Sequence, residues 1–449
     1  MEVMPENLEI FDGVKFTEHF AGNLFVNLFN GRLLYCHTQK AWFEFDGNTW
    51  IKHKTPLAFH YCRLMLRDLA AKEMAGVESK ITVKFCQAIE TFAKSDPRMA
   101  RTLDDWNKDK YLLGTPGGTI DLKTGELRRS IPANMINRSI AVTPDEYDDC
   151  PNWYRFLDEA TGGDAEFKRF LQQIAGYALT GDVSEQALFF IYGKGGRGKG
   201  VFANTLLKLM GDYGVNATME AFEKQKNGQH TTDLAMLNGA RLVTASETEE
   251  GAAWNEKRIK AITGEDRITA RFMRQDNIEF DPTFTLLIIG NFKPALRTVD
   301  DAIRRRFNIV PFNVKPARKD RHLQLKIETE WAGVLRWAIE GCLDWQKNGL
   351  VRPRVVLEAT EQYFDEQHTL AHWMEECCRV ELDNSSLSEK SSVLFESWKR
   401  YAVQAGITPG DARTFKAALE REDIVSKRTK WGMFYERIAL RFQDDAQNP

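Results

Sequence analysis

The sequence predicts an α/β fold at the centre of the chain, and three observations support this prediction. An apolar run is followed directly by a glycine-rich loop and an amphipathic helix pattern, ALFFIYGKGGRGKGVFANTLLKLMG. Strand-like and helical patterns then alternate up to about residue 345, which is typical of α/β domains. Near the carboxy terminus, two helical patterns precede a short basic hairpin pattern, which indicates a winged-helix-like domain.

The length of the chain predicts several domains. At roughly 150 residues per domain, 449 residues correspond to about three domains. Residues 1–150 mix short strand and helix patterns and are expected to form an α+β domain, and residues 151–185 show two helical patterns of a collar or linker. The α/β core is expected over 186–345, and a helical segment with the winged-helix-like domain over 346–449.

Composition limits where a binding surface can lie. The 61 basic and 64 acidic side chains leave a formal net charge of −3, so any basic, nucleic-acid-binding surface has to be local. No run approaches about 18 apolar residues, and the first residues, MEVMPENLEIFDG, lack a signal-peptide pattern, so no membrane partner is expected. Seven scattered cysteines without a CxxC pair indicate a reducing cytoplasm.

The glycine-rich run has the context that a phosphate-binding loop requires. The apolar run Leu188–Tyr192 predicts a buried strand, and a helix is expected to begin near Lys199. Glycines let the backbone turn its N–H groups toward phosphates, and the helix N-terminus adds partial positive charge. Lys199 would reach the β- and γ-phosphates of ATP. The expected nucleotide contacts are Gly193, Gly195, Gly196, Arg197, Gly198, Lys199, Gly200 and Val201.

One position departs from the usual loop, and an acidic cluster follows about 50 residues later. Gly200 stands where Ser or Thr ordinarily ligates Mg²⁺, so the metal would depend on water and on acidic groups elsewhere. The strand-like run Leu242–Ala245 leads into the acidic stretch SETEE. Such a strand end supplies a metal-binding carboxylate and the group that positions the attacking water. Glu247 is the first candidate and Glu249 the second.

Two further polar signals flank predicted strands. The run Thr285–Ile289 predicts a buried strand that is followed by Gly290 and Asn291, and a polar side chain there can hold the catalytic water or sense the γ-phosphate. Three arginines, Arg304 to Arg306, precede the alternating pattern FNIVPF. An arginine near a subunit boundary can reach the γ-phosphate of a neighbour.

Taken in order, these motifs resemble the superfamily 3 helicases of the AAA+ class, and more narrowly the poxvirus-type and phage or plasmid primase-helicases. The segments that carry the resemblance are CPNWYRFLDEA, FLQQIAGYALTG, RLVTASETEEG, IKAITGEDRITARF and RRRFNIVPF. The resemblance covers about residues 20–345, and SWKRYAVQAG and TFKAALE are similar to the winged-helix tail of the family. The amino-terminal primase domain of many relatives is not expected, because only about 150 residues precede the leading helices of the core.

The resemblance implies a role for each candidate residue. Lys199 would bind phosphate, Glu247 would stand at the acidic strand end, and Asn291 would be the sensor. Arg306, with Arg305 beside it, would be the arginine finger. Because Gly200 departs from the pattern of the family, metal coordination is the least defined part of this site.

A hairpin before the sensor strand projects into the ring channel in this class of helicases and grips single-stranded DNA. The segment ITARFMRQDNIEFDPTF itself has a hairpin pattern, with Arg274 and Gln275 nearest its tip. Arg274 is the natural phosphate contact. Lys260, just upstream on a predicted helix, is a weaker DNA-binding candidate.

We therefore expect an ATP- and Mg²⁺-dependent DNA helicase that acts as a homohexameric ring in the replication of a phage, prophage or plasmid, in the cytoplasm of a bacterial host. It would act on single-stranded and forked DNA beside a separate primase or polymerase, with 3′ to 5′ polarity implied by the resemblance alone. One alternative is an origin-binding initiator that uses ATP as an assembly switch. Another is an ATPase that translocates on duplex DNA, as in packaging.

Overall fold

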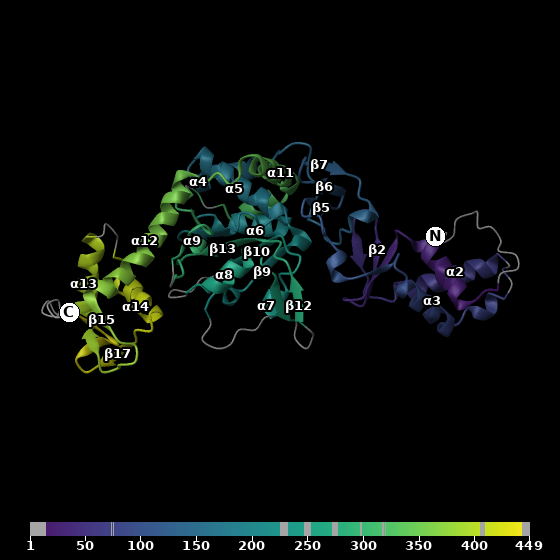
Figure 1. Ribbon diagram of the computed structural model, residues 1–449. Coiled ribbons are helices and arrows are strands. Elements are labelled where there is room, and N and C mark those ends of the chain that lie inside the picture. Colours follow the sequence, from purple (N-terminus) through teal and green to yellow (C-terminus); the bar gives the residue numbers. More distant parts are fainter. Residues whose placement is uncertain are drawn as a thin grey trace. The chain divides into compact units, whose positions relative to one another are not determined.

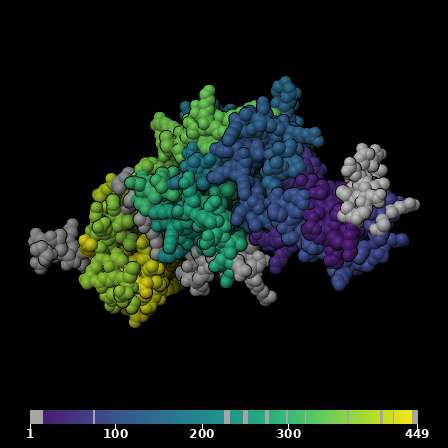
Figure 2. Space-filling model, turned by 45° about the vertical axis from the view of Figure 1, so that its right-hand side comes forward, coloured from purple at the N-terminus to yellow at the C-terminus, as the bar shows by residue number. Residues whose placement is uncertain are grey.

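The computed structural model describes residues 15–72, 74, 76–224, 232–246, 253–271, 277–296, 299–316, 318, 320–404 and 409–441, except for the side chains at 367, 368 and 421. The chain divides into two units, Met1–Thr143 and Pro144–Pro449. Figure 1 labels the helices and strands, and Figure 2 shows the surface in the same sequence colours. No helix in the described part of the chain is long and apolar enough to cross a membrane.

The amino-terminal unit combines helices with two small sheets. Its helices are α1 (Glu18–Phe29), α2 (Leu57–Ala71) and α3 (Val83–Ser95). The first sheet has the order β3-β2-β1-β4, with β1 (Leu33–Cys36), β2 (Ala41–Phe45), β3 (Trp50–Lys52) and β4 (Ala100–Arg101). The second contains β5 (Leu112–Thr115), β6 (Gly118–Asp121) and β7 (Glu126–Arg128). Phe25, Tyr61 and Phe85 belong to one buried cluster with Trp42 of the first sheet, so the helices cover that sheet.

The second unit contains a five-stranded parallel sheet of order β14-β8-β13-β10-β9. Its strands are β8 (Leu188–Tyr192), β9 (Gly214–Ala217), β10 (Leu242–Ser246), β13 (Thr285–Gly290) and β14 (Phe307–Pro311). Four of them, β8, β10, β13 and β14, are mostly apolar and buried, as expected of a parallel sheet covered on both faces, whereas β9 at one side of the sheet is partly exposed. The expected α/β core is therefore confirmed.

Alternate side chains of β8 show how the two faces are covered. Phe189 meets Phe170 of α5 (Ala165–Leu179), with ring centroids 6.0 Å apart. Phe190 meets Trp254 on the opposite face at 5.8 Å. Helices α4 (Pro151–Thr161) and α6 (Lys199–Leu209) pack together, because Trp153 stacks on Phe202 at 5.8 Å. They lie on the side of α5, because Phe202 and Phe167 of α5 both contact Phe312 just after β14.

The remaining elements connect or extend the core. The shorter helices are α7 (Thr232–Ala235), α8 (Glu256–Ile262), α9 (Asp301–Arg304) and α10 (Leu323–Glu328). The antiparallel hairpin expected before the sensor strand is present as β11 (Ile268–Arg271) and β12 (Asn277–Phe280). Two longer helices follow, α11 (Trp331–Asn348) and α12 (Arg354–Cys377).

The last part of the chain packs around an aromatic cluster of Trp373, Trp398, Phe415 and Tyr435. It contains the helices α13 (Ser391–Gln404) and α14 (Ala412–Arg421), and a sheet of order β16-β18-β17. The strands of this sheet are β16 (Ser388–Lys390), β17 (Ser426–Thr429) and β18 (Gly432–Glu436). Two further strands, β15 (Cys378–Val380) and β19 (Ile438–Leu440), pair with each other. Two helices followed by a hairpin are in the order expected of a winged helix, and that assignment stays a prediction.

Helices α5 and α11 approach each other most closely at two glycines. A Cβ atom on Gly176 would lie 2.0 Å from the backbone nitrogen of Cys342, and one on Gly341 would lie 2.1 Å from the carbonyl oxygen of Gln172. Both distances are far below van der Waals contact, and both partners are rigid backbone. Glycine is therefore required here for packing and not for backbone flexibility.

We predict that Gly176→Ala lowers the melting temperature, because the added methyl group forces α5 and α11 apart and overpacking costs about 1–3 kcal/mol. The control is Gly200→Ala, which also replaces a helical glycine but adds a Cβ whose closest neighbour, Nδ2 of Asn204, is 3.9 Å away. Helix propensity predicts that the control raises stability by roughly 0.5–1 kcal/mol. Equal melting temperatures for the two variants would contradict the packing argument.

Candidate functional site

The glycine-rich loop connects the central strand β8 to helix α6. Gly198 caps the helix, which begins at Lys199. Gly193, Gly196 and Gly198 have φ angles of 154°, 75° and 90°, a backbone region that side chains with a Cβ rarely adopt. The predicted strand, loop and helix are therefore present, with glycine where the backbone needs it.

Two of these glycines also hold the loop in place through close packing. A Cβ on Gly193 would lie 2.2 Å from the carbonyl oxygen of Phe312, just after β14, and one on Gly198 would lie 2.7 Å from Cε2 of Phe156 in α4. By contrast, no atom lies within 4 Å of a Cβ built on Gly195 or Gly196. The loop is thus fixed at its two ends and open in the middle, where a ligand can approach its N–H groups.

The ammonium group of Lys199 is buried beneath the loop. Only 7% of the residue is exposed, and Nζ donates to the carbonyl oxygens of Gly193 and Lys194, the latter at 3.1 Å, and to Oδ1 of Asn291 at 2.9 Å. Burial, and secondarily the charge of Arg197, lowers the pKa of Lys199. All three acceptors are neutral, so an anionic ligand would stabilise the charged form better than they do.

Asn291 reaches Lys199 because neighbouring parallel strands end together. Gly290 at the end of β13 pairs with Tyr192 at the end of β8, and Ser246 at the end of β10 pairs with Ile289. The structure therefore brings the predicted phosphate-binding lysine and the predicted sensor into contact. Glu247 and Glu249, which directly follow β10, lie outside the described residues, so their predicted metal-binding and catalytic roles stay predictions.

The position of Gly200 is open. A Cβ there would meet only Nδ2 of Asn204, at 3.9 Å, and the residue is exposed in the first turn of α6. Packing therefore does not explain the absence of the usual hydroxyl-bearing residue. Among the described residues, no group of three or more His, Cys, Asp or Glu side chains is placed to hold a metal ion, so the predicted Mg²⁺ would need phosphate, water and the acidic residues after β10.

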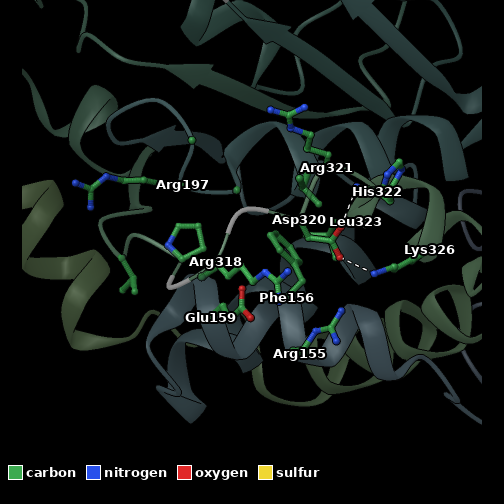
Figure 3. A pocket seen from close by; sticks show the side chains of 16 residues that line it. Arg155, Phe156, Glu159, Arg197, Arg318, Asp320, Arg321, His322, Leu323 and Lys326 are labelled. Atoms are coloured by element: carbon green, nitrogen blue, oxygen red, sulfur yellow. Dashed lines mark hydrogen bonds and ion pairs between the residues drawn. The ribbon is translucent and has the colours of Figure 1, made fainter.

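A cavity of about 730 Å³ adjoins the loop. Figure 3 shows Arg155, Phe156 and Glu159 projecting from α4 toward the segment that carries Arg318 and Asp320. Five of the lining side chains are cationic and two are anionic, and Asp320 is paired with Lys326 at 2.7 Å. The cationic lining residues are Arg155, Arg197, Arg318, Arg321 and Lys326. The net positive lining suits a phosphate-bearing ligand.

The sequence alone did not predict this group of five cationic lining side chains, which we call the cationic wall. The basic run KPARKDRH follows β14 in the sequence, and Arg155 lies more than 150 residues before it. Only the fold places both beside the phosphate loop. The run of basic residues after the last core strand is the signal that could have drawn attention to it.

The two candidate arginine fingers occupy different environments. Arg306 is 5% exposed, and its guanidinium donates to Oγ1 of Thr263 at 3.0 Å and to the carbonyl oxygen of Ala302 at 2.6 Å. The side chain of Arg305 is exposed. A finger must reach beyond its own subunit, so the burial of Arg306 favours Arg305 over the first choice, Arg306, and the role of Arg306 also stays a prediction. Arg305 becomes the first candidate, and its role stays a prediction.

Both arginines lie at the amino-terminal end of the parallel strands, whereas the glycine-rich loop lies at their carboxyl end. The N–H of Leu188, at the start of β8, donates to the carbonyl oxygen of Arg306 at 2.7 Å, whereas the loop follows the end of β8. A five-residue strand separates the two ends by roughly 16 Å.

The predicted DNA-binding residues are only partly described. Arg274 and Gln275 lie outside the described residues, between Arg271 and Asn277, which form the last described pair of the β11–β12 hairpin. Lys260 on α8 forms an ion pair with Asp300, and its contact lowers the pKa of that carboxyl group. The charge of Lys260 is therefore already balanced within the subunit, which weakens it as a DNA contact.

These features define a class: a parallel sheet, a glycine-rich loop and a buried lysine are consistent with an NTPase-like core. Two family models match parts of the chain. Residues 22–162 match the family described as "D5 N terminal like", and residues 191–306 match a "Family of unknown function (DUF5906)". The first match lies mostly in the amino-terminal unit, and the second spans the phosphate loop, Asn291 and the arginine run.

This chain is also similar to proteins of large DNA viruses. "Putative helicase L207/L206" of Acanthamoeba polyphaga mimivirus is 24% identical over 292 residues, which cover 60% of this chain and 30% of the viral protein. "Putative helicase 022R" of Frog virus 3 (isolate Goorha) is 26% identical over 301 residues, 61% of this chain and 30% of that protein. The chain thus spans less than a third of the length of these relatives. The matches show that parts of this chain are similar to viral proteins named putative helicases.

A solved structure, described as the apo form of the NrS-1 C terminal region, aligns with 94% of this chain and 99% of its own at 11% identity and a TM-score of 0.47.

We predict that Gly200→Ser retains ATP hydrolysis and lowers the Mg²⁺ concentration needed for it, because the open position admits a hydroxyl that can serve as a metal ligand. The matched control is Gly198→Ser, where the same substitution meets Phe156 and a φ of 90° and should abolish hydrolysis. The measurement is phosphate release over a Mg²⁺ titration. Loss of activity in a folded Gly200→Ser protein would show that the backbone at this position requires glycine.

Proposed function

We propose that this protein is an ATP- and Mg²⁺-dependent DNA helicase of the superfamily 3, AAA+ type, which works as a ring of identical subunits in DNA replication. The observation that carries the proposal is the contact between Lys199 and Asn291 beneath a glycine-rich loop. The strand order adds support, because β13 lies between β8, which precedes the glycine-rich loop, and β10, which precedes the acidic stretch, as in the AAA+ class.

The residues of the loop suit a nucleoside triphosphate. Its open centre presents backbone N–H groups, and the start of α6 adds the partial charge of a helix N-terminus. Lys199 would exchange its neutral acceptors for β- and γ-phosphate oxygens, and the cationic wall of the cavity would favour the negative charge. Asn291, released from Lys199, would lie within reach of the γ-phosphate or the attacking water. Mg²⁺, when bound, neutralises charge on the phosphate oxygens.

A shared site between subunits follows from the position of the arginines. Because Arg305 lies at the opposite end of the strands from its own loop, it can contribute to hydrolysis only in a neighbouring subunit. Coupling between sites and the β11–β12 hairpin would then move the hairpin along one DNA strand. A hexamer, 3′ to 5′ movement, a phage or plasmid context and a separate primase are parts of the proposal that rest on the family resemblance.

An origin-binding initiator is the second candidate function. The observation that favours it is the carboxy-terminal arrangement of α13, α14 and the β17–β18 hairpin, which would suit binding to duplex DNA. A strand-displacement assay on forked DNA separates the two functions, because an initiator would bind DNA and hydrolyse ATP but displace no strand.

We predict that Lys199→Ala abolishes ATP hydrolysis and unwinding while the protein remains folded. The ammonium is the buried cation directly beneath the loop, and no other described side chain donates to Asn291 in its place. The measurements are phosphate release, strand displacement and thermal melting. A folded variant with near-wild-type turnover would overturn the assignment of the nucleotide site.

We predict that Arg305→Ala removes hydrolysis but leaves ATP binding intact, because the loop and Lys199 are untouched. Loss of a finger costs on the order of 10³–10⁵ in rate. Arg304→Ala is the matched control, since Arg304 is already paired with Glu361 at 3.1 Å, and it should retain hydrolysis.

Mixing tests the shared site directly. Lys199→Ala keeps an intact Arg305, and Arg305→Ala keeps an intact loop, so subunit exchange between the two inactive proteins should rebuild some complete sites. Partial recovery of ATPase activity is the expected result. If fluorescence energy transfer shows exchange and no activity returns, Arg305 is not a finger, and Arg306→Ala should be tested in the same way.

A further inference from the structure

The hairpin of β17 and β18 ends in a tight, well-defined turn. Thr429 pairs with Gly432, so only Lys430 and Trp431 form the loop. The N–H of Trp431 donates to Oγ1 of Thr429 at 3.1 Å, the Thr429 hydroxyl donates to the carbonyl oxygen of Gly432 at 3.1 Å, and Gly432 has a φ of 123°. These bonds fix the backbone at the tip and the direction in which its side chains leave the hairpin.

Trp431 is exposed at this tip. At 73%, its exposed fraction is the largest among the large hydrophobic side chains that the structure describes. Leaving so large an apolar surface in water forgoes the stabilisation that burial would give it. The aromatic cluster that holds this domain together uses other residues, Trp373, Trp398, Phe415 and Tyr435. Trp431 therefore contributes nothing to that core, and its surface is available to a ligand.

Basic side chains lie at the turn and on the strands that lead to it. The Nζ atom of Lys430 lies 5.2 Å from the ring centroid. Cε of Lys390 lies 3.8 Å from a Cβ built on Gly432, so the Lys390 side chain reaches the turn as well. Arg428 is exposed on β17. Within the described part of the chain, these three cations form no ion pair, whereas the next basic residue, Lys427, is neutralised by Glu436 at 2.6 Å.

We propose that this tip binds an unpaired DNA base: the indole of Trp431 stacks on the base, and Lys430, Arg428 and Lys390 contact the adjoining phosphates. A nucleotide offers both a flat π-face and an anion within the reach of one hairpin tip, and base stacking on aromatics is typical of single-strand recognition. In the interior of a duplex the faces of the bases are covered by their neighbours and only the edges are presented, so an indole at a tip stacks on an unpaired base more readily than on a paired one. The inference rests on the proposed function in taking DNA as the ligand, and it adds a second contact site remote in sequence from the β11–β12 hairpin.

The experiment compares full-length wild type, Trp431→Ala and Trp431→Phe. The probes are a fluorescein-labelled oligothymidylate and a blunt duplex, followed by fluorescence anisotropy. Removal of a stacking aromatic should weaken single-strand binding roughly 5- to 150-fold, and phenylalanine should restore most of the loss. Tyr147→Ala is the matched control, because Tyr147 is 71% exposed and aromatic but stands between the acidic residues Glu146 and Asp148 in the sequence, and it should bind like wild type.

Salt dependence tests the role of the cations separately. Arg428→Gln should lower the slope of log affinity against log salt by about 0.7, the value for one phosphate contact on single-stranded DNA. An unchanged slope would remove Arg428 from the site.

The outcomes separate this inference from the proposed function. If wild type binds and unwinds forked DNA and Trp431→Ala binds single strands equally well, the inference is wrong and the proposed function stands. If the alanine variant loses affinity for blunt duplex as much as for single strands, the tip does not stack on an unpaired base. If wild type binds no DNA of either kind, both the proposed function and the inference are overturned. Thermal melting of each variant confirms that the fold is intact.

Discussion

The buried ammonium group of Lys199 is the interaction on which the architecture of the site depends. A charged group is costly to bury without partners, and here the partners come from two separate segments, the loop after β8 and Asn291 after β13. Those segments meet only because β8 and β13 are neighbours in a parallel sheet. The loop, the strand order and the position of Asn291 therefore depend on one another. Because the acceptors of Lys199 are neutral, its positive charge has no anionic partner among them, and a phosphate could provide one.

The same parallel sheet separates the two groups of residues to which the proposed function assigns roles. Everything that follows a core strand lies at one end of the strands, where Lys199 and Asn291 meet, while the arginines that precede β14 lie at the other. The buried Arg306 ties α9 to Thr263 after α8, so it braces the end from which Arg305 extends. In the proposed ring, each subunit would present its glycine-rich loop at one end of the strands and Arg305 at the other, which is a head-to-tail arrangement.

The parts of the site that could be predicted from the sequence are those in which local order decides the geometry. A strand, a glycine-rich loop and a helix occur in consecutive residues. Asn291 directly follows a strand whose apolar sequence alone predicts that it is buried. The environment of the arginines could not be predicted in this way, because Arg305 and Arg306 are adjacent and chemically identical. Burial of Arg306 depends on Thr263, which lies 43 residues away. The cationic wall of the cavity likewise depends on the packing of α4 against the segment after β14.

The glycines of the core show why Gly200 is a chemical difference and not a steric one. Gly193 and Gly198 are required by their backbone angles and by the atoms beside them, and Gly176 is required by the contact between α5 and α11. Gly200 meets neither condition, since its surroundings are open and its backbone is helical. The fold would accept a serine there, yet the chain lacks the hydroxyl. If Mg²⁺ binds at this loop, its coordination must come from phosphate, water and the carboxylates that follow β10, and the loop itself contributes shape and N–H groups but no metal ligand.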